Sequence, residues 1–164
     1  MKQYLIHYFI LIGLIIFTGG ALASPATTDF LVTAQIENKC TVSANPLPFG
    51  SYIYTADSDQ ITTINVTCTN GTTYTIGLDA GLGGGTTSTR KMRGTPVTNT
   101  LNYFLYSDTG RNNNWGDIIG TDTVAGVGNG NTQGIIVYGR IPSGQNTAPV
   151  DSTYADTITV TVNF

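Results

Sequence analysis

The sequence predicts an all-β domain, a β-sandwich of seven or so short strands. Thr, Gly, Asn, Tyr and Val are abundant after the first two dozen residues, whereas charged residues are sparse. Short stretches of alternating apolar and polar residues recur between glycines, prolines and asparagines, and no such stretch has the 3.6-residue period of a helix. Many short strands joined by turns are typical of a sandwich, and Greek-key connections are the expected topology.

Residues 1–23 are predicted to be a secretory signal peptide. Lys2 precedes an apolar run from Tyr4 to Phe17, and the small residues Ala21-Leu22-Ala23 follow at once, as at a cleavage site. A membrane anchor is the alternative interpretation, but the run is shorter than the roughly 20 apolar residues that span a bilayer. We therefore expect an exported mature chain that starts at Ser24 and forms one domain.

Two cysteines remain in the mature chain, Cys40 and Cys68. An even count in an exported protein favours one disulfide, because the compartment is oxidising. Metal ligation by two cysteines without histidine is the weaker alternative, since His7, the one histidine, lies in the signal peptide. The same observation argues against a histidine-based catalytic triad or pH switch.

The strands are predicted from period-two alternation and from the residues that interrupt it. The first covers residues 30–42 and ends before Pro46 and Pro48. Asn70-Gly71 is a tight-turn signal, which predicts a hairpin over residues 68–78. The remaining strands are expected at 61–68, 73–78, 101–106, 115–119, 132–141 and 154–164, with a short piece at 52–54.

Residues 81–99 form a glycine- and threonine-rich stretch that carries Arg90, Lys91 and Arg93. We expect a solvated loop here. A binding patch is the alternative, but three charges are too few to attract a polyanion over any distance.

Two apolar stripes lie near the ends of the mature chain. In the closing strand, Ile158, Val160, Val162 and Phe164 share one face, and no lysine, arginine or proline blunts the edge. Before Cys40, a second stripe has the same period of two and consists of Phe30, Val32, Ala34 and Ile36. An open sheet edge and a free apolar strand predict a subunit that polymerises, with the second stripe as donor strand and the closing strand as acceptor edge.

The titratable residues do not indicate an enzyme or a cofactor. Asp57-Ser58-Asp59 lacks the further ligands of a calcium loop and is expected to be a turn. The net charge of −3 without a basic cluster argues against nucleic acid as a partner. We expect no metal, no cofactor and no small-molecule substrate. A sugar-stacking platform of Tyr103, Tyr106, Trp115 and Tyr138 is possible, but their places within strands favour a role in the core.

Several short motifs resemble the spore coat protein U domain family, the pilins of the archaic, Csu-type chaperone-usher pathway. They run in order across nearly the whole mature chain. The matching residues are Cys40-Thr41-Val42-Ser43, Phe49-Gly50-Ser51-Tyr52, the stretch 101–108, Trp115-Gly116-Asp117, the stretch 137–142 with Gly144-Gln145, and the stretches 154–157 and 162–164. Asp151-Ser152-Thr153 departs from the family pattern, which usually has a glycine there.

The resemblance implies an incomplete immunoglobulin-like β-sandwich that lacks its final strand. In such pilins a periplasmic chaperone lends a strand, and at the outer-membrane usher the N-terminal segment of the next subunit replaces it. The partners implied are a chaperone, an usher and identical or homologous pilin subunits. Residues 24–38 become the donor segment and 39–164 the pilin domain, in a cell-surface pilus that supports adhesion and biofilm formation.

Two other classes of protein stay open from the sequence. One is a secreted carbohydrate-binding sandwich that completes its own fold, and the other is a coat or matrix protein that forms shells. Within the pilus interpretation, a single domain favours a shaft or connecting subunit over a tip adhesin, which is expected to carry a further domain.

Overall fold

A computed structural model describes residues 20 and 23–164. Most of the predicted signal peptide therefore lies outside the described residues. The chain divides into two compact units, Met1–Gln35 and Ile36–Phe164. In the first unit, residues 20 and 23–35 contain no helix or strand. Across the described residues, no helix is long and apolar enough to cross a membrane.

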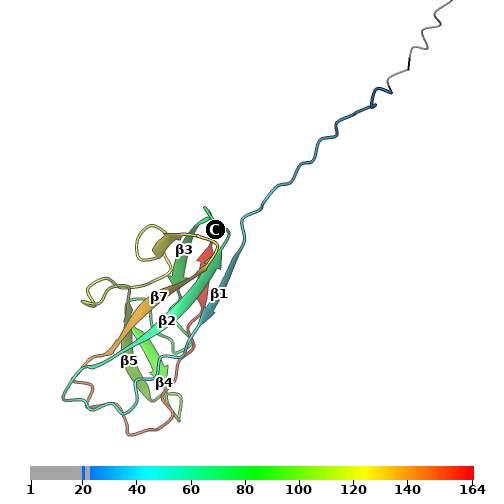
Figure 1. Cartoon of the computed structure of the whole chain (residues 1–164). Coiled ribbons are helices and arrows are strands. Elements are labelled where there is room, and N and C mark those ends of the chain that lie inside the picture. The colour runs from blue at the N-terminus through cyan, green and yellow to red at the C-terminus, as the bar shows by residue number, and fades with distance from the viewer. Residues whose placement is uncertain (1–19, 21–22) are drawn as a thin grey trace, which may run out of the picture. The chain divides into compact units, whose positions relative to one another are not determined.

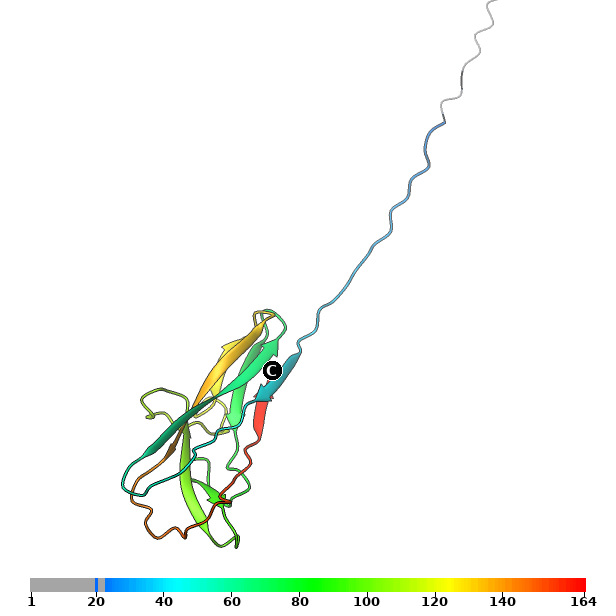
Figure 2. The ribbon, with the colours of Figure 1, turned by 60° about the horizontal axis from the view of Figure 1, so that its bottom comes forward.

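Residues 36–164 form two antiparallel sheets, which confirms the predicted all-β fold (Figure 1). The five-stranded sheet has the order β1-β2-β7-β5-β4, and the three-stranded sheet has the order β6-β3-β8. The strands are β1 (Cys40–Ala44), β2 (Ser58–Cys68), β3 (Thr73–Leu78), β4 (Arg90–Arg93), β5 (Thr100–Tyr106), β6 (Val124–Val127), β7 (Thr132–Ile141) and β8 (Val160–Asn163). The edge strands β1 and β8 lie side by side in both views (Figures 1 and 2).

The core lies between the sheets and is built by alternate residues of the central strands. Inward-facing side chains come from β2, β3, β5 and β7, and each has polar or half-buried neighbours in sequence that face outward. The buried set is Ile64, Val66, Cys68, Tyr74, Ile76, Leu78, Leu101, Tyr103, Leu105, Trp115, Val137 and Ile141. The period-two alternation therefore predicted the faces of these strands, and the bounds of β3 and β7 match the expected ones.

A disulfide joins Cys40 of β1 to Cys68 of β2. The two residues are direct partners in the β1–β2 ladder, with their Cα atoms 4.1 Å apart. The bond predicted from the sequence is present. It fixes the first residue of β1 to the last residue of β2.

The turn at Asn70 and Gly71 joins the two sheets instead of two paired strands. β2 pairs with β1 and β7, whereas β3 pairs with β6 and β8, so the hairpin predicted over residues 68–78 is wrong. Gly71 has a φ of 84°, and its N–H donates to the carbonyl of Gly128. An Asn-Gly pair reverses the chain, but it does not determine which strand pairs with which.

Trp115 lies in a connection and not in the strand predicted over residues 115–119. Its side chain is fully buried, and its backbone N–H donates to the carbonyl of Leu105 in β5. The indole N–H donates to the carbonyl of Ile76 in β3, 2.9 Å away. The residue thus bonds to both sheets, through its backbone N–H to β5 and through its indole N–H to β3.

Arg90 begins β4 and is fully buried, so the solvated loop expected over residues 81–99 is wrong at this point. Its guanidinium donates four hydrogen bonds of 2.7 to 2.9 Å to backbone carbonyls, those of Leu78, Asp79, Thr87 and Trp115. Burial lowers the pKa of this guanidinium. The arginine can be buried because each of its three guanidinium nitrogens has a hydrogen-bond partner.

The first and last of the predicted strands are shorter than expected. The strand predicted over 30–42 is present only as β1, and the one over 154–164 only as β8. No strand covers 52–54, while β4 and β6 were not expected. Prolines 46 and 48 prevent a ladder after β1, because proline has no N–H to donate.

Replacing Arg90 by lysine should destabilise the domain by about 2 to 4 kcal/mol, because an ammonium cannot reach all four carbonyls and leaves some of them buried and unpaired. Urea unfolding of the mature chain, residues 24–164, measures this difference. Arg93→Lys is the matched control, since Arg93 is exposed and its Nε bonds only to the carbonyl of Gly83. Equal midpoints for the two variants would contradict the role assigned to Arg90.

Candidate binding groove

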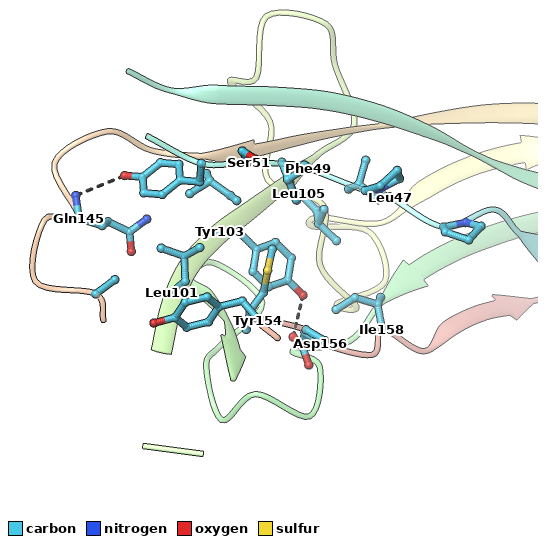
Figure 3. Close-up of a pocket in the computed structure, with 18 of the residues that line it drawn as sticks. Leu47, Phe49, Ser51, Leu101, Tyr103, Leu105, Gln145, Tyr154, Asp156 and Ile158 are labelled. Atoms are coloured by element: carbon cyan, nitrogen blue, oxygen red, sulfur yellow. Dashed lines mark hydrogen bonds between the residues drawn. The ribbon is translucent and has the colours of Figure 1, made fainter. Parts of the chain in front are cut away.

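An apolar groove of about 1280 Å³ opens over the core between two segments that lie mostly outside the strands (Figure 3). One wall is residues 44–54, which follow β1, and the other is residues 154–160, which lead into β8. The floor consists of core side chains from four strands, namely Ile64, Met92, Leu101, Tyr103, Leu105, Val137 and Ile141. Apart from the half-buried Met92, each of these floor side chains is at most 4% exposed, so the groove lies directly over the core.

The first wall packs onto β7 through a glycine. A Cβ atom at Gly139 would lie 2.6 Å from Leu47 and 2.8 Å from Phe49, so any other residue would displace this wall. The ring of Phe49 also meets Tyr103 edge to face, with centroids 6.3 Å apart. Asn45 ties the wall to β2, since its N–H donates to the carbonyl of Thr63.

The second wall is held by the carboxylate of Asp156. This carboxylate accepts hydrogen bonds from the N–H groups of Leu82 and Gly83 and from the hydroxyl of Tyr103, all within 2.9 Å. Burial, followed by the hydrogen bond to Asp156, raises the pKa of Tyr103 well above its usual range. Ala155 adds a two-way backbone pairing with Arg93 in β4. This wall is thus attached to β5 through Tyr103 and to β4 through Arg93.

One end of the groove is polar. The side-chain amide of Gln145 accepts from the N–H of Asn102 at 2.7 Å and donates to the carbonyl of the same residue at 2.9 Å. The hydroxyl of Tyr52 donates to the carbonyl of Pro142. These bonds satisfy backbone groups of β5 and of the chain just beyond β7, so the floor ends there in a closed network.

The two strands nearest the groove are each paired on one side. β1 pairs only with β2, and β8 pairs only with β3, among the strands of residues 36–164. No ladder joins β1 to β8 in this part of the chain, although the two strands lie side by side. The open edges and the apolar groove together have the dimensions and chemistry to accept an extended strand.

The structure places the two predicted stripes differently. Ile158 and Val160 line the groove, whereas Val162 packs on the core outside it and Phe164 is exposed. Phe30, Val32 and Ile36 of the other stripe are 77 to 85% exposed, and Ala34 is also exposed. The first wall was missed from the sequence, although its paired prolines signalled a segment that cannot form a ladder.

The aromatic residues fall into two groups. Trp115 and Tyr103 are in the core, as favoured from the sequence. Tyr106 and Tyr138 are half-buried partners in the β5–β7 ladder, and Arg111 lies over the ring of Tyr138.

The acidic pair Asp57 and Asp59 binds an arginine. Both carboxylates contact Arg140, and Asp59 does so through two hydrogen bonds of 2.7 Å. Asp59 is the second residue of β2, where it pairs with Arg140 of β7, and it is not in the turn expected from the sequence. In residues 20 and 23–164, no cluster of three His, Cys, Asp or Glu side chains has a metal-binding arrangement.

Residues 36–164 are thus a β-sandwich of two antiparallel sheets, with an apolar groove between the segment that follows β1 and the segment that leads into β8. The chain belongs to the Spore Coat Protein U domain family, whose profile matches residues 26–161. It is 33% identical to "Protein U" of Myxococcus xanthus over 160 residues, which cover 88% of each chain. The resemblance inferred from the short motifs is thereby confirmed.

The fold is also similar to one in a solved structure. The match is to a chain of the CsuC-CsuE chaperone-tip adhesion subunit pre-assembly complex from archaic chaperone-usher Csu pili of Acinetobacter baumannii, with a TM-score of 0.58 and 23% identity. The alignment covers 79% of this protein and 40% of that chain. At this identity the likeness shows the fold alone.

The carboxylate of Asp151, in the loop before the second wall, should make the stability of the domain depend on pH. Hydrogen bonds from the Thr153 hydroxyl, then from the N–H groups of Thr95 and Thr153, lower the pKa of Asp151 from 3.8 to about 2. A carboxylate whose pKa is lower in the folded state contributes stability that is complete above its unfolded pKa and lost as the pH falls toward its folded pKa. Asp151→Asn should therefore lower the melting temperature near neutral pH, and its difference from wild type should shrink between pH 4 and 2.

Melting curves of the mature chain across that pH range measure this effect. Asp29→Asn, in the N-terminal segment, is the control. A constant difference between wild type and Asp151→Asn down to pH 2 would rule out the linkage.

Proposed function

We propose that this protein is a structural pilus subunit that polymerises by donor-strand exchange. The groove of one subunit accepts the N-terminal segment of the next, and the repeated head-to-tail contact builds a fibre. The observation that carries the proposal is the pairing of an open groove over the core with an exposed apolar stripe of Phe30, Val32, Ala34 and Ile36. Residues 24–38 are the donor segment and residues 39–164 the pilin domain.

The groove accounts for the type of ligand. Its floor is apolar, and its two walls are extended segments that are each paired on one side at most, so an inserted strand gains backbone partners and side-chain pockets together. Ile158 and Val160 form the acceptor edge within the groove, and Val162 and Phe164 continue it along β8. Alternate residues of the donor face the floor, as the spacing of the stripe requires.

The energetics favour exchange over the docking of a free strand. Burying Phe30, Val32 and Ile36 stabilises by roughly 5 to 9 kcal/mol, and ordering about eight residues costs about 1 to 2 kcal/mol each. These terms are comparable, so a disordered donor gains little on its own. Exchange of one bound strand for another avoids most of the ordering cost, and a periplasmic chaperone that lends a strand supplies that first occupant.

The remaining partners and the location follow from the same proposal. An outer-membrane usher is the site of exchange, after export directed by residues 1–23. The assembled pilus lies at the cell surface, where it supports adhesion and biofilm formation. The role is structural and not catalytic. The family membership and the fold similarity to a chain of a chaperone–subunit complex from chaperone-usher pili support these assignments.

A fused donor strand tests whether the domain needs an external strand. We expect the mature chain with residues 24–38 repeated after Phe164 to be a soluble monomer, because the added segment can fill the groove. The unfused chain should instead need a chaperone or form oligomers, as measured by light scattering after size exclusion. If the unfused chain is an equally stable monomer, the self-complete binding domain becomes the better interpretation.

Ile36→Asp should stop chain growth and leave the chaperone-bound subunit intact, because a charge would have to enter an apolar pocket. Gln35→Asp is the matched control, since Gln35 adjoins Ile36 on the opposite face of the strand. Electron microscopy of surface filaments, with subunit content measured by immunoblot, provides the readout. Undiminished filaments from Ile36→Asp would refute the donor assignment.

A further inference from the structure

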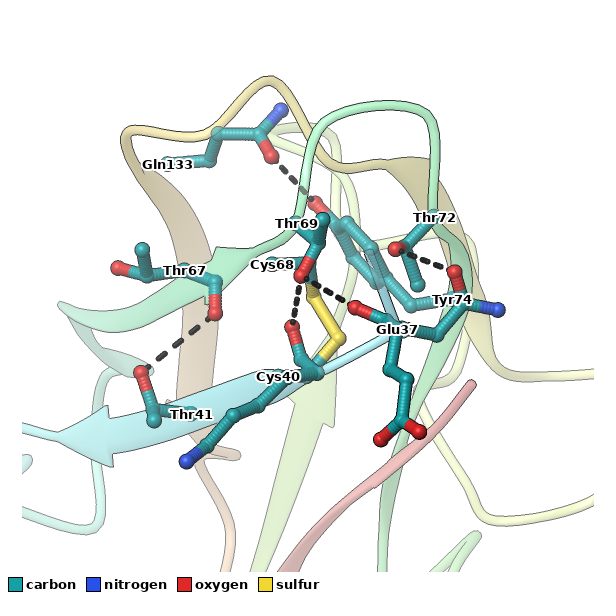
Figure 4. The surroundings of a disulfide bond; sticks show 11 residues. Glu37, Cys40, Thr41, Thr67, Cys68, Thr69, Thr72, Tyr74 and Gln133 are labelled. Atoms are coloured by element: carbon teal, nitrogen blue, oxygen red, sulfur yellow. Dashed lines mark hydrogen bonds between the residues drawn. A yellow bond between two sulfur atoms is a disulfide. The ribbon is translucent and has the colours of Figure 1, made fainter. Parts of the chain in front are cut away.

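The residues between the N-terminal stripe and β1 are bonded to the turn that follows β2 (Figure 4). The Thr69 hydroxyl shares its one proton between the carbonyl of Glu37, 3.2 Å away, and that of Lys39, 3.4 Å away. The Thr69 N–H donates to the Lys39 carbonyl at 2.9 Å, and the Thr72 hydroxyl donates to Asn38 Oδ1 at 3.1 Å. All three residues of the segment 37–39 are therefore held by one turn.

The disulfide adds a covalent restraint at the same place. Cys40 follows Lys39 directly, and its bond to Cys68 lies one residue before Thr69. Thr72 is 2% exposed, and its bond to the exposed Asn38 is partly buried. We name Thr69, Thr72 and the Cys40–Cys68 disulfide the root clamp.

A donor segment could in principle enter the groove of its own chain, and the clamp bears on that alternative. The segment would have to reverse direction within residues 37–39 and run back along β1. A hairpin with its turn there would place Ile36 beside Cys40 and Val32 beside Ala44, because paired residues advance together along the two strands. The turn would break the bonds that hold residues 37–39 to Thr69 and Thr72.

The register of such a hairpin also fits poorly. The groove begins at Ala44 and continues along the wall to Tyr54. Ala34 and Ile36 would lie beside β1, where β1 and β8 already approach each other. Thr27, Thr28 and Asp29 would then face the stretch from Leu47 to Phe49, which lines the apolar groove. Most of the apolar stripe would therefore lie beside β1, before the groove begins, and polar residues would face the apolar groove instead.

We infer that the root clamp is a specificity device, which directs the N-terminal stripe to the groove of a second copy by preventing it from turning back into its own. This inference rests on the proposed donor-strand exchange. Thr69 and Thr72 act as positioning residues, because they hold the segment that precedes β1 and do not touch the groove. Because residues 37–39 are held in place, the N-terminal stripe that precedes them is bound by the groove of another subunit.

Isotope mixing separates the two routes. Equal amounts of unlabelled and ¹⁵N-labelled mature chain, each with a photo-reactive residue at position 33, are unfolded with the disulfide intact, mixed, refolded and irradiated. Mass spectrometry then identifies crosslinks between position 33 and the groove walls. Crosslinks between copies contain both isotopes in half of the products, whereas crosslinks within one chain contain one isotope.

When the root clamp has its natural sequence, we expect half of the crosslinks between position 33 and the groove walls to be mixed, that is, to contain both isotopes. Thr69→Val with Thr72→Val should reduce the mixed fraction several-fold, and Thr69→Ser with Thr72→Ser, which keeps both hydroxyls, should restore it. A flexible Gly-Ser insertion of about ten residues after Ile36, with a mean span of about 17 Å, should reduce the mixed fraction further. The same insertion after Thr28 leaves the clamp intact and should change nothing.

The outcomes distinguish the inference from the function beneath it. If position 33 forms no crosslink to the groove in any form, donor-strand exchange itself is wrong. If mixed crosslinks form but neither the valine pair nor the insertion after Ile36 lowers their fraction, exchange stands and the clamp has no part in directing it. The insertion keeps the test informative if the valine pair fails to fold.

Discussion

The relation between β1 and β8 is the constraint on which the rest of the domain depends. These edge strands belong to different sheets and lie side by side without a ladder between them in residues 36–164. Beyond Ala44 the segment that follows β1 and the segment that leads into β8 line the groove over the core. The other features of the domain hold the two sheets together despite this opening.

Hydrogen bonds to backbone groups provide much of that support. Trp115 bonds to both sheets, and Arg90 binds the carbonyl of Trp115 together with those of β3 and its neighbours. Asp156 holds the second wall to a glycine turn, where a Cβ at Gly81 would collide with its carboxylate. These polar groups are fully paired, so they add rigidity without leaving buried donors or acceptors unsatisfied. The groove can remain open because these hydrogen bonds hold its surroundings in place.

The sequence predicted which face of a strand is buried better than it predicted which strands pair with each other. Alternation identified β3 and β7 with their observed bounds, since it reports which face of a strand is buried. It could not show that the chain changes sheets at Asn70 and Gly71, because the same turn serves a hairpin or a crossover. Arg90 looked solvated for a related reason: its carbonyl partners come from residues 78, 79, 87 and 115, which only the fold brings together. Both apolar stripes were visible in the sequence, and Ile158 and Val160 of one of them line the groove, whereas the first wall, interrupted by prolines, was not predicted.

The position of the disulfide has a mechanical consequence. In a fibre built as proposed, tension along the filament would enter each domain through Ile36 and reach Cys40 first. The bond to Cys68 divides this load between β1 and β2, and β2 is paired with β7 along most of its length. Force directed along these strands would act on many backbone bonds in shear at once instead of opening them one after another. The domain would then resist pulling best at the point where its neighbour is attached.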